Sequence, residues 1–122
     1  MNRSMNRSTL RIAIAILTLA TALIHLYIAF INFQTGAFEF QPMFLLNGLG
    51  YLGLMAALLM KLPFLAGRER LLHYAYMGYA AVTILGWVAF GARNILGYSD
   101  KIVEILLILA LWQHLRLGEK AA

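Results

Sequence analysis

Ionisable residues stand inside the apolar stretches of this chain, and they are the residues best placed to do chemistry. His25 lies within a largely apolar run from Ile12 to Ile31, and Glu104 interrupts a run from Ile102 to Leu117. A histidine beside a carboxylate can relay a proton or hold a quinone head, and an ionisable residue at membrane depth is a functional hypothesis by default. We therefore single out His25 and Glu104 as a pair, which could equally serve only to lock two helices together.

Helical periodicity places further polar residues near this pair. Thr18, Thr21, His25 and Asn32 follow one another at intervals of 3, 4 and 7 residues, so they share one face of a helix. If successive helices alternate in direction, a polar pocket forms in the half of the protein away from the termini. Its predicted lining is His25, Asn47, Tyr51, Thr83, Trp87, Asp100 and Glu104. A hydrogen-bonded cluster with a structural role would have the same composition.

Metal and haem chemistry can be weighed from spacing. Two carboxylates and a histidine can bind a divalent cation, but no spacing such as H-E-x-x-H supports one, and we predict no metal site. Small four-helix membrane bundles can hold a b-type haem between two histidines, and the candidates here are His73 and His114. No phosphate-binding loop, G-x-S-x-G motif or cysteine occurs, so we do not expect an enzyme. We also predict no cofactor, with haem b or a quinone as the alternative.

Four apolar runs must position these residues, and they divide almost the whole chain of 122 residues. A bilayer core of about 30 Å takes roughly 20 helical residues. The first three runs have this length, and the fourth has it only if its polar ends lie among the lipid headgroups. The sequence predicts one all-α domain over residues 1–122, a transmembrane four-helix up-down bundle with helices at about 10–32, 42–61, 70–92 and 100–117. A turn at 97–100 would precede the last helix, capped by Ser99 or Asp100.

Composition agrees with a membrane protein. The chain is 62% hydrophobic and 12% charged, whereas about 25% of the residues of an ordinary soluble domain are charged. A soluble domain of this size has too little interior to bury so much apolar surface, so the excess must face lipid.

The basic residues are distributed unevenly between the two predicted sides of the membrane. Eight belong to the termini and the middle connection, and two to the other connections: Arg3, Arg7, Arg11, Lys61, Arg68, Arg70, Arg116 and Lys120 against Arg93 and Lys101. The positive-inside rule then predicts that both termini and the middle connection are cytoplasmic. Attraction to anionic lipid headgroups accounts for the net charge of +5, and no nucleic-acid partner is expected.

Three short motifs carry a resemblance to a known group. They are I-H-L-Y at 24–27, F-L-L-N-G-L-G-Y-L-G at 44–53 and S-D-K-I-V-E at 99–104. With them the chain resembles small uncharacterised prokaryotic four-helix integral membrane proteins, a group from which no activity can be transferred. The resemblance implies that the residues of interest are His25, Asn47, Asp100, Lys101 and Glu104.

The function that follows from these patterns is an accessory or scaffold subunit of a larger membrane complex. Its expected partners are the lipid bilayer and other membrane subunits or further copies of itself. One alternative is a small redox, haem b or quinone-binding protein that uses the pocket around His25 and Glu104. A homo-oligomeric small transporter is a third hypothesis, which is disfavoured because no helix carries a ladder of ion or substrate ligands.

Overall fold

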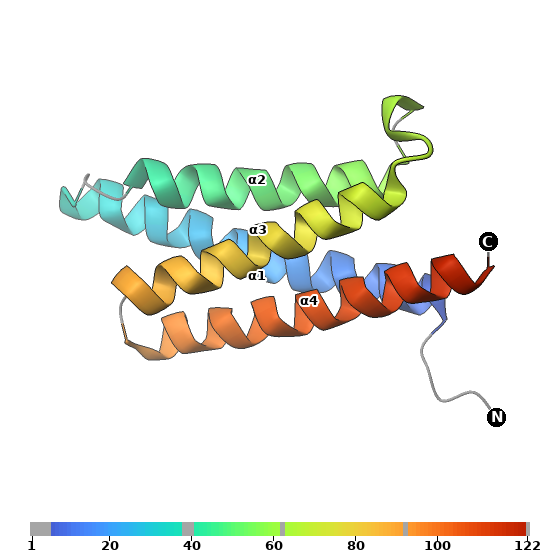
Figure 1. Ribbon diagram of the computed structural model, residues 1–122. Coiled ribbons are helices and arrows are strands. Elements are labelled where there is room, and N and C mark those ends of the chain that lie inside the picture. The colour runs from blue at the N-terminus through green and yellow to red at the C-terminus, as the bar shows by residue number, and fades with distance from the viewer. Residues whose placement is uncertain (1–5, 38–40, 62, 92, 122) are drawn as a thin grey trace.

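Four long helices make up the protein. The computed structural model describes residues 6–37, 41–61, 63–91 and 93–121, and within these ranges it holds helices and no strand. The helices lie along one another in an elongated bundle, and a short 3₁₀ turn, η1, precedes the third of them (Figure 1). Their bounds are α1 Arg7–Thr35, α2 Gln41–Leu59, η1 Pro63–Leu65, α3 Glu69–Phe90 and α4 Ile95–Ala121. The prediction of an all-α protein with four helices is confirmed.

The bundle has two distinct ends. The start of α1, the connection from α2 to α3 and the last turns of α4 lie together at what we call the terminal end (Figure 1). The end of α1 and start of α2 lie at the opposite, far end, together with the end of α3 and start of α4. Local signals set these limits. The Asn6 side chain accepts a hydrogen bond from the Thr9 N–H at 2.8 Å, and Gly36 ends α1 in the left-handed conformation, with φ of 78°.

The start of α4 differs from the prediction. Residues 97–100 were expected to form a turn capped by Ser99 or Asp100, but α4 begins at Ile95, and these residues are helical. The cap is Asn94, whose side-chain oxygen accepts a hydrogen bond from the Gly97 N–H at 2.8 Å. The added turn carries Asp100 into the bundle, where it is only 3% exposed.

Helices α1, α2 and α3 are long and apolar enough to cross a membrane. Helix α1 packs closely against both α2 and α4, whereas α2 and α3 touch less. Gly48 permits the α1–α2 approach, because a Cβ atom there would lie 3.1 Å from the Ala22 carbonyl oxygen. These findings are compatible with a membrane location.

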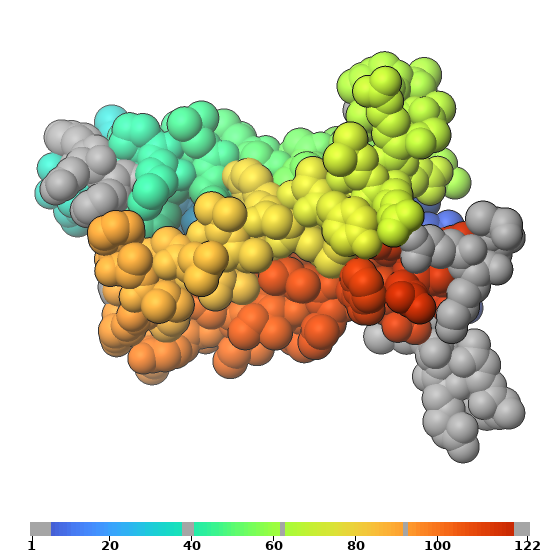
Figure 2. Space-filling model, in the orientation of Figure 1, coloured from blue at the N-terminus to red at the C-terminus, as the bar shows by residue number. Residues whose placement is uncertain are grey.

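Helix α4 carries its polar residues on the inside. Its buried residues include Asp100, Lys101, Glu104 and His114, together with Leu107 and Leu111. Its outward side chains are large and apolar, among them Ile102, Ile105, Leu106, Leu109 and Trp112. This polarity is the reverse of a helix on the surface of a soluble protein. The space-filling view shows α2, α3 and α4 side by side across one face of the molecule (Figure 2).

Candidate functional site

A buried set of polar side chains joins α1, α2 and α4. We call it the charge cluster, and all of its members are at most 7% exposed. Because Thr21 and His25 are one turn apart on α1, both face the same side, and the same spacing brings Asp100 and Glu104 together on α4. The members are Thr21, His25, Tyr51, Asp100, Lys101 and Glu104.

Glu104 is surrounded by hydrogen-bond donors. The Tyr51 hydroxyl donates to its Oε2 atom at 2.5 Å, and the Lys101 ammonium donates to Oε1 at 2.6 Å. The Thr21 hydroxyl is 3.4 Å from Oε2. A carboxylate with no surface exposure requires such partners, because an unpaired buried charge costs several kcal/mol. Burial and the neighbouring Asp100 carboxylate oppose the ionised form of Glu104, and these donors act against that effect.

Asp100 is the carboxylate that faces His25. Its Oδ1 atom accepts a hydrogen bond from the Thr21 hydroxyl at 2.6 Å, and its Oδ2 atom accepts one from Lys101 at 3.0 Å. The Nε2 atom of His25 is 3.6 Å from the same Oδ2 atom. The predicted pair of His25 and Glu104 therefore lies in one cluster, but it is Asp100 that forms the ion-pair contact with the imidazole.

The tautomer of His25 follows from its contacts. Its Nδ1 atom lies 2.8 Å from the Thr21 carbonyl oxygen, which can only accept, so Nδ1 carries a hydrogen. Nε2 then faces the Asp100 carboxylate either as a bare lone pair, which is repulsive, or as an N–H donor. The arrangement can thus hold one proton between His25 and Asp100.

The other residues of the predicted pocket separate into two groups. The Asn47 side-chain amide donates to the Thr83 hydroxyl at 2.9 Å, and the Tyr79 hydroxyl donates to the Asn47 backbone carbonyl at 2.8 Å. The Tyr79 ring also packs edge-on against Tyr51, with centroids 4.9 Å apart. Asn47 and Thr83 therefore adjoin the charge cluster through two tyrosines.

Trp87 lies in a different contact group. Its ring packs edge-on against Tyr98 at 5.0 Å, and the Arg93 guanidinium lies 4.1 Å from the ring centroid. Both partners belong to the region where α3 ends and α4 begins. The prediction placed Trp87 in the correct half of the bundle, but these two contacts are not with the cluster.

One metal-ligand set occurs in the described part of the chain. It consists of His25, Asp100 and Glu104, whose ligand atoms, one from each residue, all lie within 4.8 Å of one another. However, Lys101 Nζ already bonds to both carboxylates, so a cationic group stands where a metal ion would bind. The residues do not fit a divalent cation unless Lys101 is displaced.

The two haem candidates lie at the terminal end, buried inside the bundle. His73 Nε2 is 2.8 Å from His114 Nδ1, and the two rings stack with centroids 5.0 Å apart and an interplanar angle of 19°. Axial haem ligands must direct their nitrogens at an iron between them, with the porphyrin separating the rings. These two histidines would have to move apart to do so.

The resemblance named Lys101 as a residue of interest, but the residues themselves did not predict its central role. It was assigned to the connection between the third and fourth helices, yet it bridges both carboxylates. Its spacing from Glu104, at i and i+3, was the available signal. A second buried contact was also missed, a hydrogen bond between the Thr18 and Tyr76 hydroxyls.

Comparison with protein-family models, with curated proteins and with solved structures found no match for the chain. The resemblance to small prokaryotic four-helix membrane proteins therefore stays a prediction, and the functional argument depends on the geometry of the chain itself.

Proposed function

We propose that the protein spans the cytoplasmic membrane of a prokaryote four times, up and down, with the terminal end in the cytoplasm. Basic residues support this orientation. Arg7, Arg11, Lys61, Arg68, Arg70 and Arg116 belong to the terminal end, whereas Arg3 lies outside the described residues, as does the side chain of Lys120. Lys101 is buried, so Arg93 is the one basic side chain left for the far end among the described residues. This is the asymmetry that the positive-inside rule requires.

The inward polarity of α4 supports its being the fourth span. Its mean hydropathy is lowered by charges that the other helices cover, while Ile102, Ile105 and Leu109 on its outer side are between 49% and 60% exposed. Such a surface suits lipid contact and would be costly in water. Reporter fusions after Gly36 and at the C-terminus test the topology. They should report opposite sides of the membrane, and reports from one side would refute the four-span arrangement.

Within the membrane, we propose that the protein is an accessory or scaffold subunit of a larger assembly, formed with other membrane subunits or with its own copies. The observation that carries this proposal is the closure of the charge cluster. Each carboxylate oxygen of Asp100 and Glu104 accepts a hydrogen bond from within the cluster. A closed network joins three helices into a rigid unit and leaves the apolar exterior for contact with partners.

Photo-crosslinking in native membranes tests this role. Val82 on α3 is 69% exposed, and Gly78 and Gly86 nearby have open space at their Cβ positions, so a partner helix can approach closely. A crosslinking side chain at Val82 should give a discrete protein adduct, and the same group at the buried Ile14 should give none. Recovery of only lipid adducts and monomer at native abundance would refute the proposal.

A second candidate function is proton transfer, in line with the transporter and quinone hypotheses. It is favoured by the approach of His25 Nε2 to Asp100 Oδ2 at 3.6 Å. Vesicles containing the protein and a pH-sensitive dye should then acidify faster than empty vesicles under a proton gradient. Asp100→Asn should abolish the difference, and Tyr76→Phe, outside the cluster, should keep it. A rate equal to that of empty vesicles rejects this candidate. Haem or quinone binding would appear as a Soret band or a co-purified quinone.

A further inference from the structure

A pocket opens at the terminal end of the bundle, whereas the charge cluster lies toward the far end. It has a volume of about 320 Å³, roughly the space of ten liquid water molecules. The start of α1, the end of α2, the start of α3 and the end of α4 all contribute to it. This is enough room for a phosphate group with part of a glycerol backbone.

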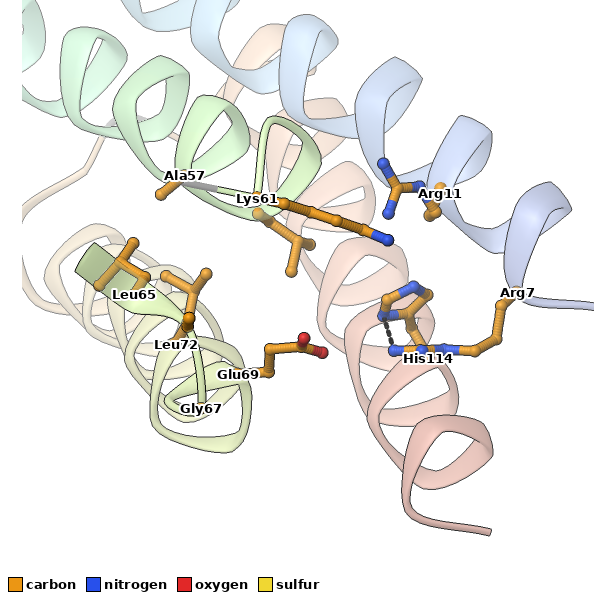
Figure 3. A pocket seen from close by; sticks show the side chains of 11 residues that line it. Arg7, Arg11, Ala57, Lys61, Leu65, Gly67, Glu69, Leu72 and His114 are labelled. Carbon is orange, nitrogen blue, oxygen red and sulfur yellow. Dashed lines mark hydrogen bonds between the residues drawn. The ribbon is translucent and has the colours of Figure 1, made fainter. Parts of the chain in front are cut away.

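Cationic side chains dominate the lining. Figure 3 shows the Lys61 ammonium, the Arg11 guanidinium and the His114 ring gathered on one side, with Arg7 beside His114. Glu69 reaches in from the start of α3 as the acidic residue of the lining. With His114 neutral, three positive charges against one negative leave a charge of +2 around the pocket.

Two buried nitrogen atoms in this lining lack a hydrogen-bond partner within the described residues. They are Arg7 Nε and His114 Nε2, and His114 is only 2% exposed. His73 Nδ1 lies 2.7 Å from the Glu69 carbonyl oxygen, which can only accept, so a neutral His73 presents a lone pair on Nε2 to His114 Nδ1 at 2.8 Å. A neutral His114 then carries its hydrogen on Nδ1, and its Nε2 atom is an acceptor. The unpartnered donor is therefore Arg7 Nε, an N–H group that an anionic oxygen would satisfy.

The backbone at the pocket is also suited to an anion. Gly67 and Glu69 line the pocket, so the first turn of α3 borders it, and Arg68 gives that turn no side-chain cap. A helix N-terminus is the positive end of the helix dipole. Lys61 has φ of 50°, a left-handed conformation that is unfavourable for a residue other than glycine. Residues held in this way cluster at binding sites.

We propose that this basic pocket binds a phosphate-bearing anion, which is either the headgroup of an anionic phospholipid or a soluble phosphate. Basic pockets between membrane helices on the cytoplasmic side suit anionic headgroups. The site is separate from the charge cluster and does not depend on the subunit role proposed above.

The test uses the full chain purified in a non-ionic detergent. Phosphatidylglycerol and phosphatidylcholine are compared by native mass spectrometry, and inorganic phosphate and chloride by thermal shift. Phosphatidylglycerol or phosphate should bind at least about tenfold more tightly than its comparison compound. Binding of the lipid alone assigns the headgroup source, and binding of phosphate alone assigns the soluble source. Failure of both overturns the proposal.

Four variants distinguish binding in the pocket from general electrostatic attraction. Lys61→Gln should weaken binding about tenfold, while Lys61→Arg should retain it. Glu69→Gln should strengthen binding, because it removes the negative charge from the lining. Arg116→Gln is the matched control, since it removes a positive charge at the same end but outside the lining. Equal losses in Lys61→Gln and Arg116→Gln, or weaker binding in Glu69→Gln, would overturn the proposal.

Discussion

Removing one hydroxyl from the charge cluster tests whether a hydrogen bond to a charged acceptor in the cluster is stronger than one to a neutral acceptor. Tyr51 and Tyr76 are both fully buried, and each makes a side-chain hydrogen bond across helices. The partner of Tyr51 is the Glu104 carboxylate, whereas the partner of Tyr76 is the neutral Thr18 hydroxyl. Tyr51→Phe and Tyr76→Phe therefore make the same chemical change at sites that differ mainly in the charge of the acceptor.

The expected losses of unfolding free energy follow from that difference. Hydrogen bonds between neutral groups in membrane proteins contribute about 0.6 kcal/mol on average, which is the estimate for Tyr76→Phe. Bonds to a charged group contribute about 1.5–3 kcal/mol. Because Glu104 keeps the Lys101 ammonium as a donor, the lower part of that range applies to Tyr51→Phe. We therefore expect about 2 kcal/mol for Tyr51→Phe, roughly three times the loss for Tyr76→Phe.

The assay is unfolding by sodium dodecyl sulfate in mixed micelles, followed by circular dichroism. A double-mutant cycle with Glu104→Gln isolates the pairwise interaction, and it should give at least about 1 kcal/mol of coupling with Tyr51→Phe. The same cycle with Tyr76→Phe should be additive. Equal losses for the two tyrosines, or additivity in both cycles, would refute the assignment of Glu104 as the buried charged acceptor.

Three further predictions concern packing, capping and the basic pocket. Gly50→Ala should lower the free energy of unfolding by about 1–3 kcal/mol, because the new Cβ atom would lie 2.1 Å from the Tyr79 hydroxyl. Gly53→Ala is the control, since its Cβ atom meets open space, and it should be neutral or stabilising in the same assay. Asn94→Ala should cost about 1 kcal/mol through loss of the α4 cap, with Asn94→Asp as the variant that retains it. Lys61→Gly should weaken anion binding, because it removes the ammonium group. It should not lower the melting temperature, because glycine suits the left-handed φ at this position. A lower melting temperature would contradict this explanation.

The helices themselves could be predicted from the sequence because long apolar runs have few alternatives in lipid. The start of α4 could not. Gly97 and Ser99 favour a turn locally, but packing of Asp100, Lys101 and Glu104 against α1 and α2 keeps this segment helical. Tertiary contacts of this kind override local propensity, and a single sequence does not show them.

The composition of the site could be predicted in part. The face formed by Thr18, Thr21 and His25 is buried as expected, whereas Asn32 farther along is only partly buried. Which carboxylate meets His25 could not be predicted, because Asp100 and Glu104 share a face of α4 and differ mainly by about 6 Å in position along the helix axis. Trp87 is a similar case. Its position along α3 could be inferred from the sequence, but its ring contacts with Tyr98 and Arg93 could not.

If α4 is the fourth span, as we propose, its inward polarity makes its insertion dependent on the other helices. Alone in a bilayer it would place Asp100, Lys101 and Glu104 in or near the hydrocarbon, where a charged residue costs about 3 kcal/mol at the centre of a helix. In the bundle, each of these charges bonds to another cluster member, and Thr21 and Tyr51 supply the remaining donors from α1 and α2. The apolar side chains of α4 then face outward and add to the lipid-facing surface of the other helices. In the proposed topology, the charge cluster thus explains how α4, which is less apolar than the other three helices, can complete a membrane bundle.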